Sequence, residues 1–227
     1  MIKLLVFDLD GTLADTRLDL AASVNATLTR FELKTLETSQ IIAFVGDGAD
    51  DLIRKCLRSA GLSQVEADAK TPEVLREFLD YYQHHCMVHT HAYAGAHVLL
   101  EQFHGVKALL TNKPLKPTMR VLEGLGFQKH FLAVIPGDGP MGKKPDPRGM
   151  AAILSIAGVR PDEAVMIGDG IQDLRTARAA GTRSIAFLGG MGDPRALQQE
   201  GADAMVYHLD AIPAILGEWD RKRRVHG

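Results

Sequence analysis

Six short, almost wholly apolar runs limit the folds open to this chain. Each is four or five residues long and is bounded by Gly, Asp or other polar residues. Runs of this length and continuity are typical of strands that are buried on both faces, as in a parallel sheet. We expect strands at 3–7, 106–110, 133–136, 164–167, 184–188 and 204–207.

Helical stretches separate these runs. Residues 118–126, 147–158 and 173–181 are typical of helices, and the last two end in Gly158 and Gly181, which suit a helix C-cap. Strands that alternate with helices indicate an α/β fold with a doubly wound, Rossmann-like parallel sheet.

One long region interrupts the alternation. Between residues 18 and 87 apolar side chains recur at helical spacing, and no convincing strand is found. We therefore expect a core made of residues 1–14 and 90–227, with an all-helical unit, 15–89, inserted after the first strand.

Composition argues against several classes of partner. The chain has 26 Lys+Arg against 28 Asp+Glu, a net charge of -2, so it has no general attraction to nucleic acid or anionic membranes. Its two cysteines exclude a disulfide framework, and no apolar stretch approaches the ~20 residues of a membrane span. We expect a cytoplasmic protein.

A pair of acids, Asp8 and Asp10, follows the first apolar run. Residues two apart in an extended chain project to the same side, and open α/β sheets bind their ligands at the carboxyl ends of strands. Like charges this close repel, so the pair needs a cation or a proton. A solvated turn at Gly11 is the structural alternative.

Other expected strands also end in polar residues. Thr111 and Asn112 follow the second run, Asp169 and Asp173 follow the fourth, and Lys144 precedes a helix. In a doubly wound sheet these positions can converge on one crevice. Carboxylates there suit Mg²⁺, an Asp can act as a covalent nucleophile, and a lysine supplies the positive charge that phosphoryl transfer needs.

These residues stand in the order of four motifs, and the chain resembles the haloacid dehalogenase superfamily of phosphohydrolases. DxDGT begins at Asp8, the Thr/Ser motif is Thr111-Asn112, the lysine is Lys144, and GDxxxD ends at Asp173. The resemblance covers nearly the whole chain, because the helical insert matches the cap that these enzymes carry between the first two motifs.

The resemblance implies a Mg²⁺ cofactor and two catalytic acids. Asp8 attacks phosphorus to give an aspartyl-phosphate, and Asp10 first protonates the leaving alcohol and then activates water. The metal is bound by Asp8, the backbone carbonyl of Asp10 and Asp169, while Asp173 binds it directly or orients a metal-bound water. A carboxylate at position 10 favours phosphate esters over halides, because a departing halide needs no proton.

The resemblance also implies how the phosphoryl group is held. Thr111, the backbone of Asn112 and the turn at Gly11 bind its oxygens, and Lys144 orders Asp8 and offsets charge. One departure is Gly170, where many relatives have Ser or Thr.

The loop at Gly46 and Gly48 indicates which substrate to expect. It resembles the VGxG-type cap loop of bacterial phosphoglycolate phosphatases, which implies hydrolysis of 2-phosphoglycolate to glycolate and phosphate. Separately, we expect a monomer or a homodimer. An ordinary loop between helices is the structural alternative. Alternative functions are hydrolysis of pyrophosphate or another small phosphoester, a phosphosugar mutase, and a receiver-like or regulatory protein.

Overall fold

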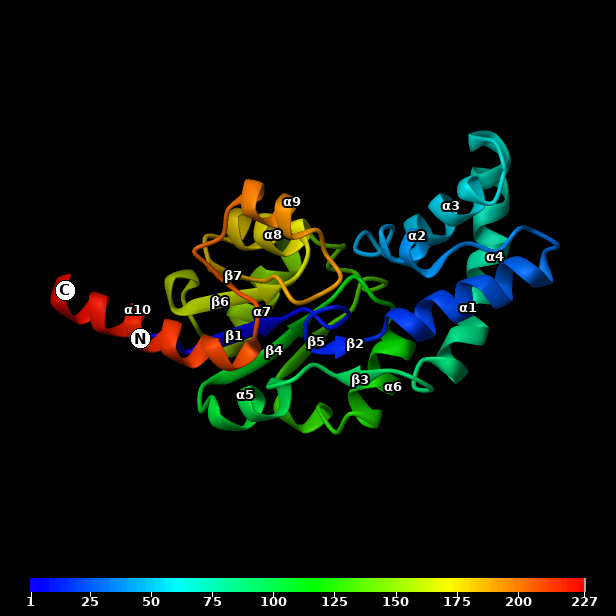
Figure 1. Cartoon of the computed structure of the whole chain (residues 1–227). Helices are drawn as coiled ribbons and strands as arrows, with labels where there is room; N and C mark the ends of the chain where they lie inside the picture. The colour runs from blue at the N-terminus through cyan, green and yellow to red at the C-terminus, as the bar shows by residue number, and fades with distance from the viewer. Residues whose placement is uncertain (227) are drawn as a thin grey trace.

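The computed structural model describes residues 1–226, with side chains through Lys222, and centres on a six-stranded parallel sheet (Figure 1). The strand order β5-β4-β1-β6-β7-β8 places β1 inside the sheet, and the chain winds outward from it in both directions. Each expected strand is present within one residue of its expected bounds, which confirms the doubly wound α/β fold. The strands are β1 (Leu4–Phe7), β4 (Val106–Leu110), β5 (Ala133–Ile135), β6 (Ala164–Gly168), β7 (Arg183–Phe187) and β8 (Ala204–Val206).

Helices cover both faces of the sheet. Leu5 and Phe7 of β1 join an apolar cluster with α5, α6 and α10, whereas Leu4 and Val6 pack with α7 and α8 on the other face. Burial on both faces explains why the strands are almost wholly apolar. The helices are α5 (Ala96–Gln102), α6 (Leu115–Gly124), α7 (Arg148–Ala157), α8 (Ile171–Ala180), α9 (Pro194–Glu200) and α10 (Ile212–His226), with short 3-10 turns at Gln128–His130, Pro161–Glu163 and Leu209–Ala211.

Two helix ends agree with their sequence signals, whereas α6 and α8 begin three and two residues earlier than expected. Gly158 and Gly181 follow α7 and α8 in the left-handed conformation, with φ of 63° and 70°. Helix α6 begins at Leu115 rather than at residue 118, so that Pro117 lies inside its first turn. Proline is tolerated there because the N–H groups of a first turn have no partner within the helix.

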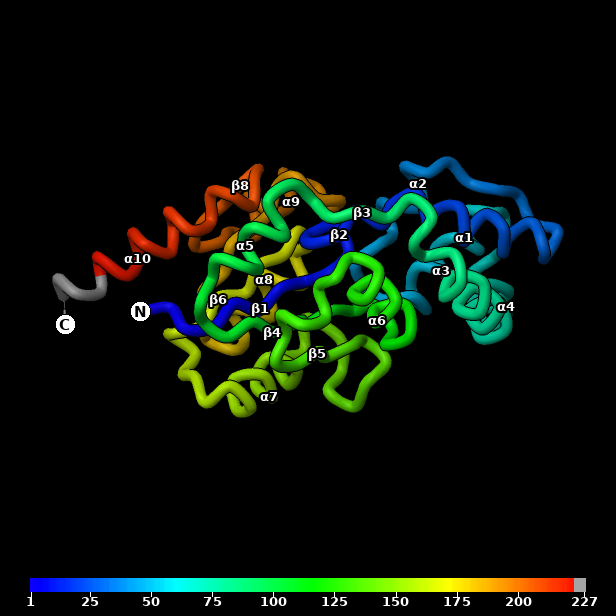
Figure 2. The backbone as a smooth tube through the Cα atoms, turned by 90° about the horizontal axis from the view of Figure 1, so that it is seen from below, coloured from blue at the N-terminus to red at the C-terminus, as the bar shows by residue number. Residues whose placement is uncertain are grey.

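The inserted region is helical, as its periodicity predicts. Four helices, α1 (Arg17–Arg30), α2 (Thr38–Ile42), α3 (Ala49–Ser59) and α4 (Gln64–His85), form a cap that lies to one side of the sheet, away from the N-terminus and α10 (Figures 1 and 2). Two short strands that the sequence did not indicate, β2 (Ala14–Asp15) and β3 (His91–Ala92), pair antiparallel where the chain leaves and re-enters the core.

Helix α4 presents one side to the rest of the cap. Its buried residues Val74, Phe78 and Tyr82 recur every fourth position, and the Phe78 and Tyr82 rings stack with centroids 5.3 Å apart. Tyr82 is the last residue of this row, and its hydroxyl contacts Lys113 of the α/β core. Although α4 has 22 residues, neither it nor another helix among residues 1–226 has the sustained apolar character of a bilayer-spanning segment.

Candidate active site

Three neighbouring strands end beside one another at one edge of the sheet. Asp8 follows β1, Thr111 follows β4 and Asp169 follows β6, and β1 pairs in parallel with both of the other strands. The fold therefore brings together residues that are far apart in the sequence.

Lys144 lies between two carboxylates. Its Nζ is 2.8 Å from Asp8 Oδ1 and 2.7 Å from Asp173 Oδ1, and only 2% of its side chain is exposed. Burial disfavours its charge, but the two carboxylates raise the pKa of Lys144 above its ordinary value, so it stays an ammonium. Its neighbour Lys143 instead pairs with Asp50 of the cap.

Asp8, Asp169 and Asp173 form an acidic group that could hold a metal ion. One carboxylate oxygen from each lies within 4.8 Å of the others, and residues 1–222, whose side chains the structure describes, contain no further such group of His, Cys, Asp or Glu. Burial and mutual repulsion raise the pKa of Asp169 to about 6, and burial raises the pKa of Asp173 against the pull of Lys144. Oxygen ligands in this number suit a hard divalent cation, which would offset the repulsion.

Asp169 is held in place by donors from two loops. Thr12 Oγ1 donates to its Oδ1 (2.8 Å), and the N–H groups of Met191 and Gly192 donate to its Oδ2 (2.8 and 3.1 Å). The carboxylate also packs against Gly11, where a Cβ atom would come within 2.1 Å of Asp169 Oδ2. Glycine is required at position 11 for this approach and for its φ of 83°.

The backbone of Gly11, a residue expected to bind phosphate, has a partner within its own loop. Its N–H donates to the carbonyl of Ala14 (2.9 Å), which closes the turn after β1 and leaves this N–H engaged. The residue shapes the loop and makes room for Asp169.

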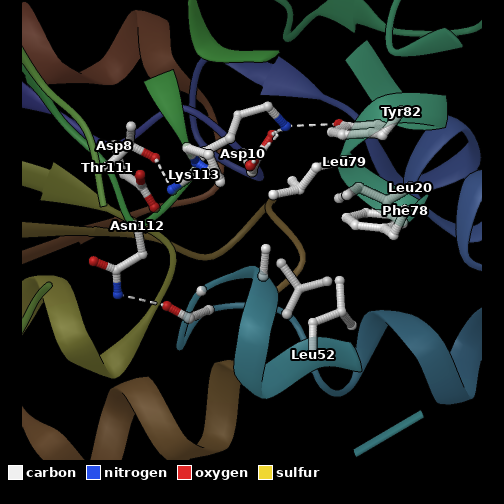
Figure 3. A pocket seen from close by; sticks show the side chains of 15 residues that line it. Asp8, Asp10, Leu20, Leu52, Phe78, Leu79, Tyr82, Thr111, Asn112 and Lys113 are labelled. Carbon is white, nitrogen blue, oxygen red and sulfur yellow. Dashed lines mark hydrogen bonds and ion pairs between the residues drawn. The ribbon is translucent and has the colours of Figure 1, made fainter. Parts of the chain in front are cut away.

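Asp10 has partners of its own. Thr16 Oγ1 donates to its Oδ1 (2.7 Å), and Lys113 Nζ lies 2.9 Å from Oδ1 and 3.1 Å from Oδ2. The same Nζ donates to the Tyr82 hydroxyl at 2.6 Å (Figure 3). Each acid of the pair thus has a buried lysine, which offsets the repulsion that the sequence implies between them.

The Asn112 side chain links three segments, a role that the sequence did not indicate. Its Nδ2 donates to the carbonyls of Gly46 (2.8 Å) and Lys144 (3.0 Å), and its Oδ1 accepts from the Lys144 N–H (2.7 Å). It therefore fixes the backbone of the lysine loop and connects that loop to the cap. Thr111, which is 2% exposed, lies beside it in the pocket wall.

The cap loop closes over this edge of the sheet. Gly46 and Gly48 line a pocket together with Asp8, Asp10 and Thr111. This loop bonds to the core through Asp47, which accepts from Gln172, and the first turn of α3 does so through Asp50, which pairs with Lys143. Much of the remaining pocket wall is apolar, including Leu20, Leu52, Phe78 and Leu79 (Figure 3).

Sequence reasoning missed Thr16, Lys113 and Tyr82. Lys113 directly follows Thr111-Asn112, so its place after a strand was a usable signal, although no role was assigned to it. Tyr82 gave no signal, because its distance from Asp10 depends on how the cap docks.

Residues 5–187 match the family described as haloacid dehalogenase-like hydrolase. The chain belongs to this family. A phosphoglycolate phosphatase of Rhodospirillum rubrum is 36% identical over 186 residues, 80% of this chain and 77% of the relative. One of Mesorhizobium japonicum is 33% identical and covers 95% of both chains. A solved structure described as a predicted phosphoglycolate phosphatase of Haemophilus somnus superposes with a TM-score of 0.87 at 25% identity, covering 95% of this chain and 98% of its own.

Enzymes of this family need a metal ion, which bears on the acidic group. Haloacid dehalogenase-like phosphatases are metal-dependent hydrolases of phosphoesters, and the cluster of Asp8, Asp169 and Asp173 is suited to hold the ion. The chain is accordingly a phosphoric monoester hydrolase.

Proposed function

We propose that this protein hydrolyses 2-phosphoglycolate to glycolate and phosphate, with Asp8 as nucleophile and Mg²⁺ as cofactor. The observation that carries the proposal is the setting of Asp8, which has a buried lysine at 2.8 Å and two carboxylates within reach of a shared cation. Such a setting suits phosphoryl transfer, because it can hold a metal and offset the charge of the transferring group.

In the first step, a carboxylate oxygen of Asp8 attacks phosphorus and the bond to the ester oxygen breaks. Asp10 gives its proton to the departing alkoxide, and an aspartyl-phosphate remains on Asp8. Lys144 Nζ and the Leu9 N–H both contact Asp8 Oδ1, at 2.8 and 2.7 Å, and these contacts orient the carboxylate for attack.

In the second step, water attacks phosphorus, Asp10 takes up a proton from this water, and the bond to Asp8 breaks to release phosphate. The Thr111 hydroxyl and the backbone of Asn112 bind the phosphoryl oxygens. Asp8, Asp169, Asp173 and the Asp10 carbonyl would hold Mg²⁺, which would supply positive charge to offset that of the phosphoryl group.

The cap serves as a lid over the reaction. The loop that carries Gly46 and Gly48 lies on the pocket and is tied to the core through Asn112, so it can exclude water while the phosphoryl group is transferred.

The names of the relatives support the substrate. Two proteins named phosphoglycolate phosphatase align with most of this chain. The loop at Gly46 and Gly48 also resembles the VGxG-type cap loop of that group. A small pocket beneath a cap also suits a small ester.

The test is phosphate release by the purified chain with Mg²⁺ from 2-phosphoglycolate, pyrophosphate, sugar phosphates, nucleotides and phosphoserine. We expect 2-phosphoglycolate to have the highest kcat/KM, and Asp8→Asn to lower it at least ~10³-fold, as loss of a nucleophile does elsewhere. Asp68→Asn, the same change at an exposed acid of the cap, should leave the rate unchanged. A low rank for 2-phosphoglycolate refutes the substrate, and a near-normal rate in Asp8→Asn refutes the mechanism.

A cytoplasmic location and a monomeric or homodimeric state complete the proposal. Cys56 and Cys86 are both free and buried, which fits a reducing compartment, and burial raises the pKa of Cys56 to about 12. Cell fractionation and size-exclusion chromatography test these two points.

A further inference from the structure

Lys113 is a buried cation that has no role in the two phosphoryl-transfer steps described above. Its side chain is 2% exposed, and its Nζ lies between a core acid, Asp10, and a cap hydroxyl, Tyr82 (Figure 3). Burying an ammonium is unfavourable unless it is paired, and the Asp10 carboxylate is the charged partner of Lys113.

Few charged side chains line the pocket. The charged lining residues are Asp8, Asp10 and Lys113, while the cap contributes mostly apolar side chains such as Leu52, Phe78 and Leu79. Within this lining, Lys113 is the one cation among the described residues. A second anionic group on a substrate would meet two carboxylates and an apolar wall unless it reached Lys113.

The position of Asp10 determines where the leaving group lies in the pocket. If Asp10 protonates the leaving oxygen, the group attached to that oxygen lies on the Asp10 side of the pocket. In 2-phosphoglycolate a single methylene separates the ester oxygen from the carboxylate. Lys113 Nζ is 2.9 Å from Asp10 Oδ1, so this ammonium lies beside the place that the carboxylate must occupy.

The hydrogen bonds of Lys113 hold its ammonium group at the pocket. An ammonium has three N–H donors, and the Asp10 carboxylate and the Tyr82 hydroxyl are its hydrogen-bond partners among the described residues. Asp10 and Tyr82 hold Nζ at the pocket, and the flexible four-carbon stem allows it to turn toward a ligand oxygen.

We propose that Lys113 binds the carboxylate of the substrate and thereby selects phosphoesters whose alcohol carries an anionic group next to the ester carbon. This inference rests on the proposed function, since it takes Asp10 as the acid and a carboxylated alcohol as the leaving group. The alternative is that Lys113 only joins α4 to the core through Tyr82 and Asp10.

The experiment compares two substrates that differ only at the distal group, 2-phosphoglycolate and 2-hydroxyethyl phosphate. The readout is the ratio of their kcat/KM values, because a general loss of activity in a variant cancels in the ratio. We expect a wild-type ratio well above ten and a drop of about 10- to 100-fold in Lys113→Met, the range for a hydrogen bond to a charged group. Most of the change should be in KM for 2-phosphoglycolate.

Two variants complete the design. Lys113→Arg keeps the charge and should retain most of the preference, whereas Lys116→Met removes an exposed lysine three residues on and should match the wild type. If Lys113→Met does not fold, as judged by circular dichroism, Lys113→Gln gives the same readout while keeping a donor for Asp10.

The outcomes separate the two claims. A wild-type preference that survives in Lys113→Met or Lys113→Gln overturns the inference and leaves the proposed function standing, because a purely structural lysine slows both substrates equally. A wild type that hydrolyses 2-hydroxyethyl phosphate but not 2-phosphoglycolate overturns the proposed substrate and the inference together.

Discussion

Without a metal, the protein should become more stable as the pH falls from 7 to 5, because of Asp169. This carboxylate is 5% exposed, lies beside Asp8 and has a pKa raised to about 6 in the folded state, against 3.8 for an ordinary aspartate. The folded chain therefore binds a proton at Asp169 more tightly than the unfolded chain does.

The sign and the size of this change in the free energy of unfolding follow from proton linkage. When a pKa is higher in the folded state than in the unfolded state, the group stabilises the fold at low pH. This stabilisation is complete below the unfolded-state pKa and is lost as the pH rises through the folded-state pKa. A shift from 3.8 to about 6 corresponds to about 3 kcal/mol in full, of which roughly 1 kcal/mol develops between pH 7 and pH 5.

The assay is urea unfolding of the wild type and Asp169→Asn in EDTA at pH 5, 6 and 7. Other titrating groups are common to both proteins, so the difference between their free energies of unfolding isolates Asp169. We expect that difference to shift by about 1 kcal/mol in favour of the wild type as the pH falls from 7 to 5. Mg²⁺ competes with the proton for this carboxylate and should stabilise the wild type more at pH 7 than at pH 5.

Two results would refute this reasoning. One is a difference between the two proteins that does not change with pH, which would mean that Asp169 titrates alike in both states. The other is an equal effect of Mg²⁺ on the wild type and Asp169→Asn, which would mean that the ion binds elsewhere.

Three further substitutions test other parts of the site. Lys144→Met leaves Asp8 and Asp173 without their shared cation, so kcat for 2-phosphoglycolate should fall at least ~10²-fold, and near-normal turnover would contradict this role. Asp10→Asn should lower kcat/KM for that substrate about 10²- to 10⁴-fold but kcat/KM for p-nitrophenyl phosphate far less, because kcat/KM reports the first step and nitrophenolate leaves unprotonated; an equal loss of kcat/KM on both would argue against Asp10 as the acid. Asn112→Ala removes three hydrogen bonds, so the free energy of unfolding in urea should drop by about 1–3 kcal/mol, and an unchanged urea midpoint would show that they add little.

Much of the fold could be predicted because local pattern and burial agree. Most strand residues are apolar since the sheet is covered on both faces, and Gly158 and Gly181 end their helices in the left-handed conformation that glycine favours. The β2 and β3 strands could not be predicted, because each has two residues and their pairing arises from the return of the cap to the core.

The site was partly predictable for a similar reason. Asp8, Thr111 and Asp169 stand directly after strands, and parallel topology alone brings such positions together. The partners of Asp10 were not predictable, since Tyr82 reaches it from a helix of the cap and no local pattern encodes that docking. The side chain of Asn112 was likewise unforeseen, because its bonds to Gly46 and Lys144 depend on loops that the sequence leaves undefined.

The most direct test of the account is chemical trapping of the covalent intermediate on Asp8. The protein is mixed with 2-phosphoglycolate and Mg²⁺, quenched with borohydride, which reduces an acyl phosphate to an alcohol, and mapped by peptide mass spectrometry. The account predicts homoserine at position 8, dependent on substrate and absent without it. Steady hydrolysis with an unmodified Asp8, or with reduction at another carboxylate, would contradict it.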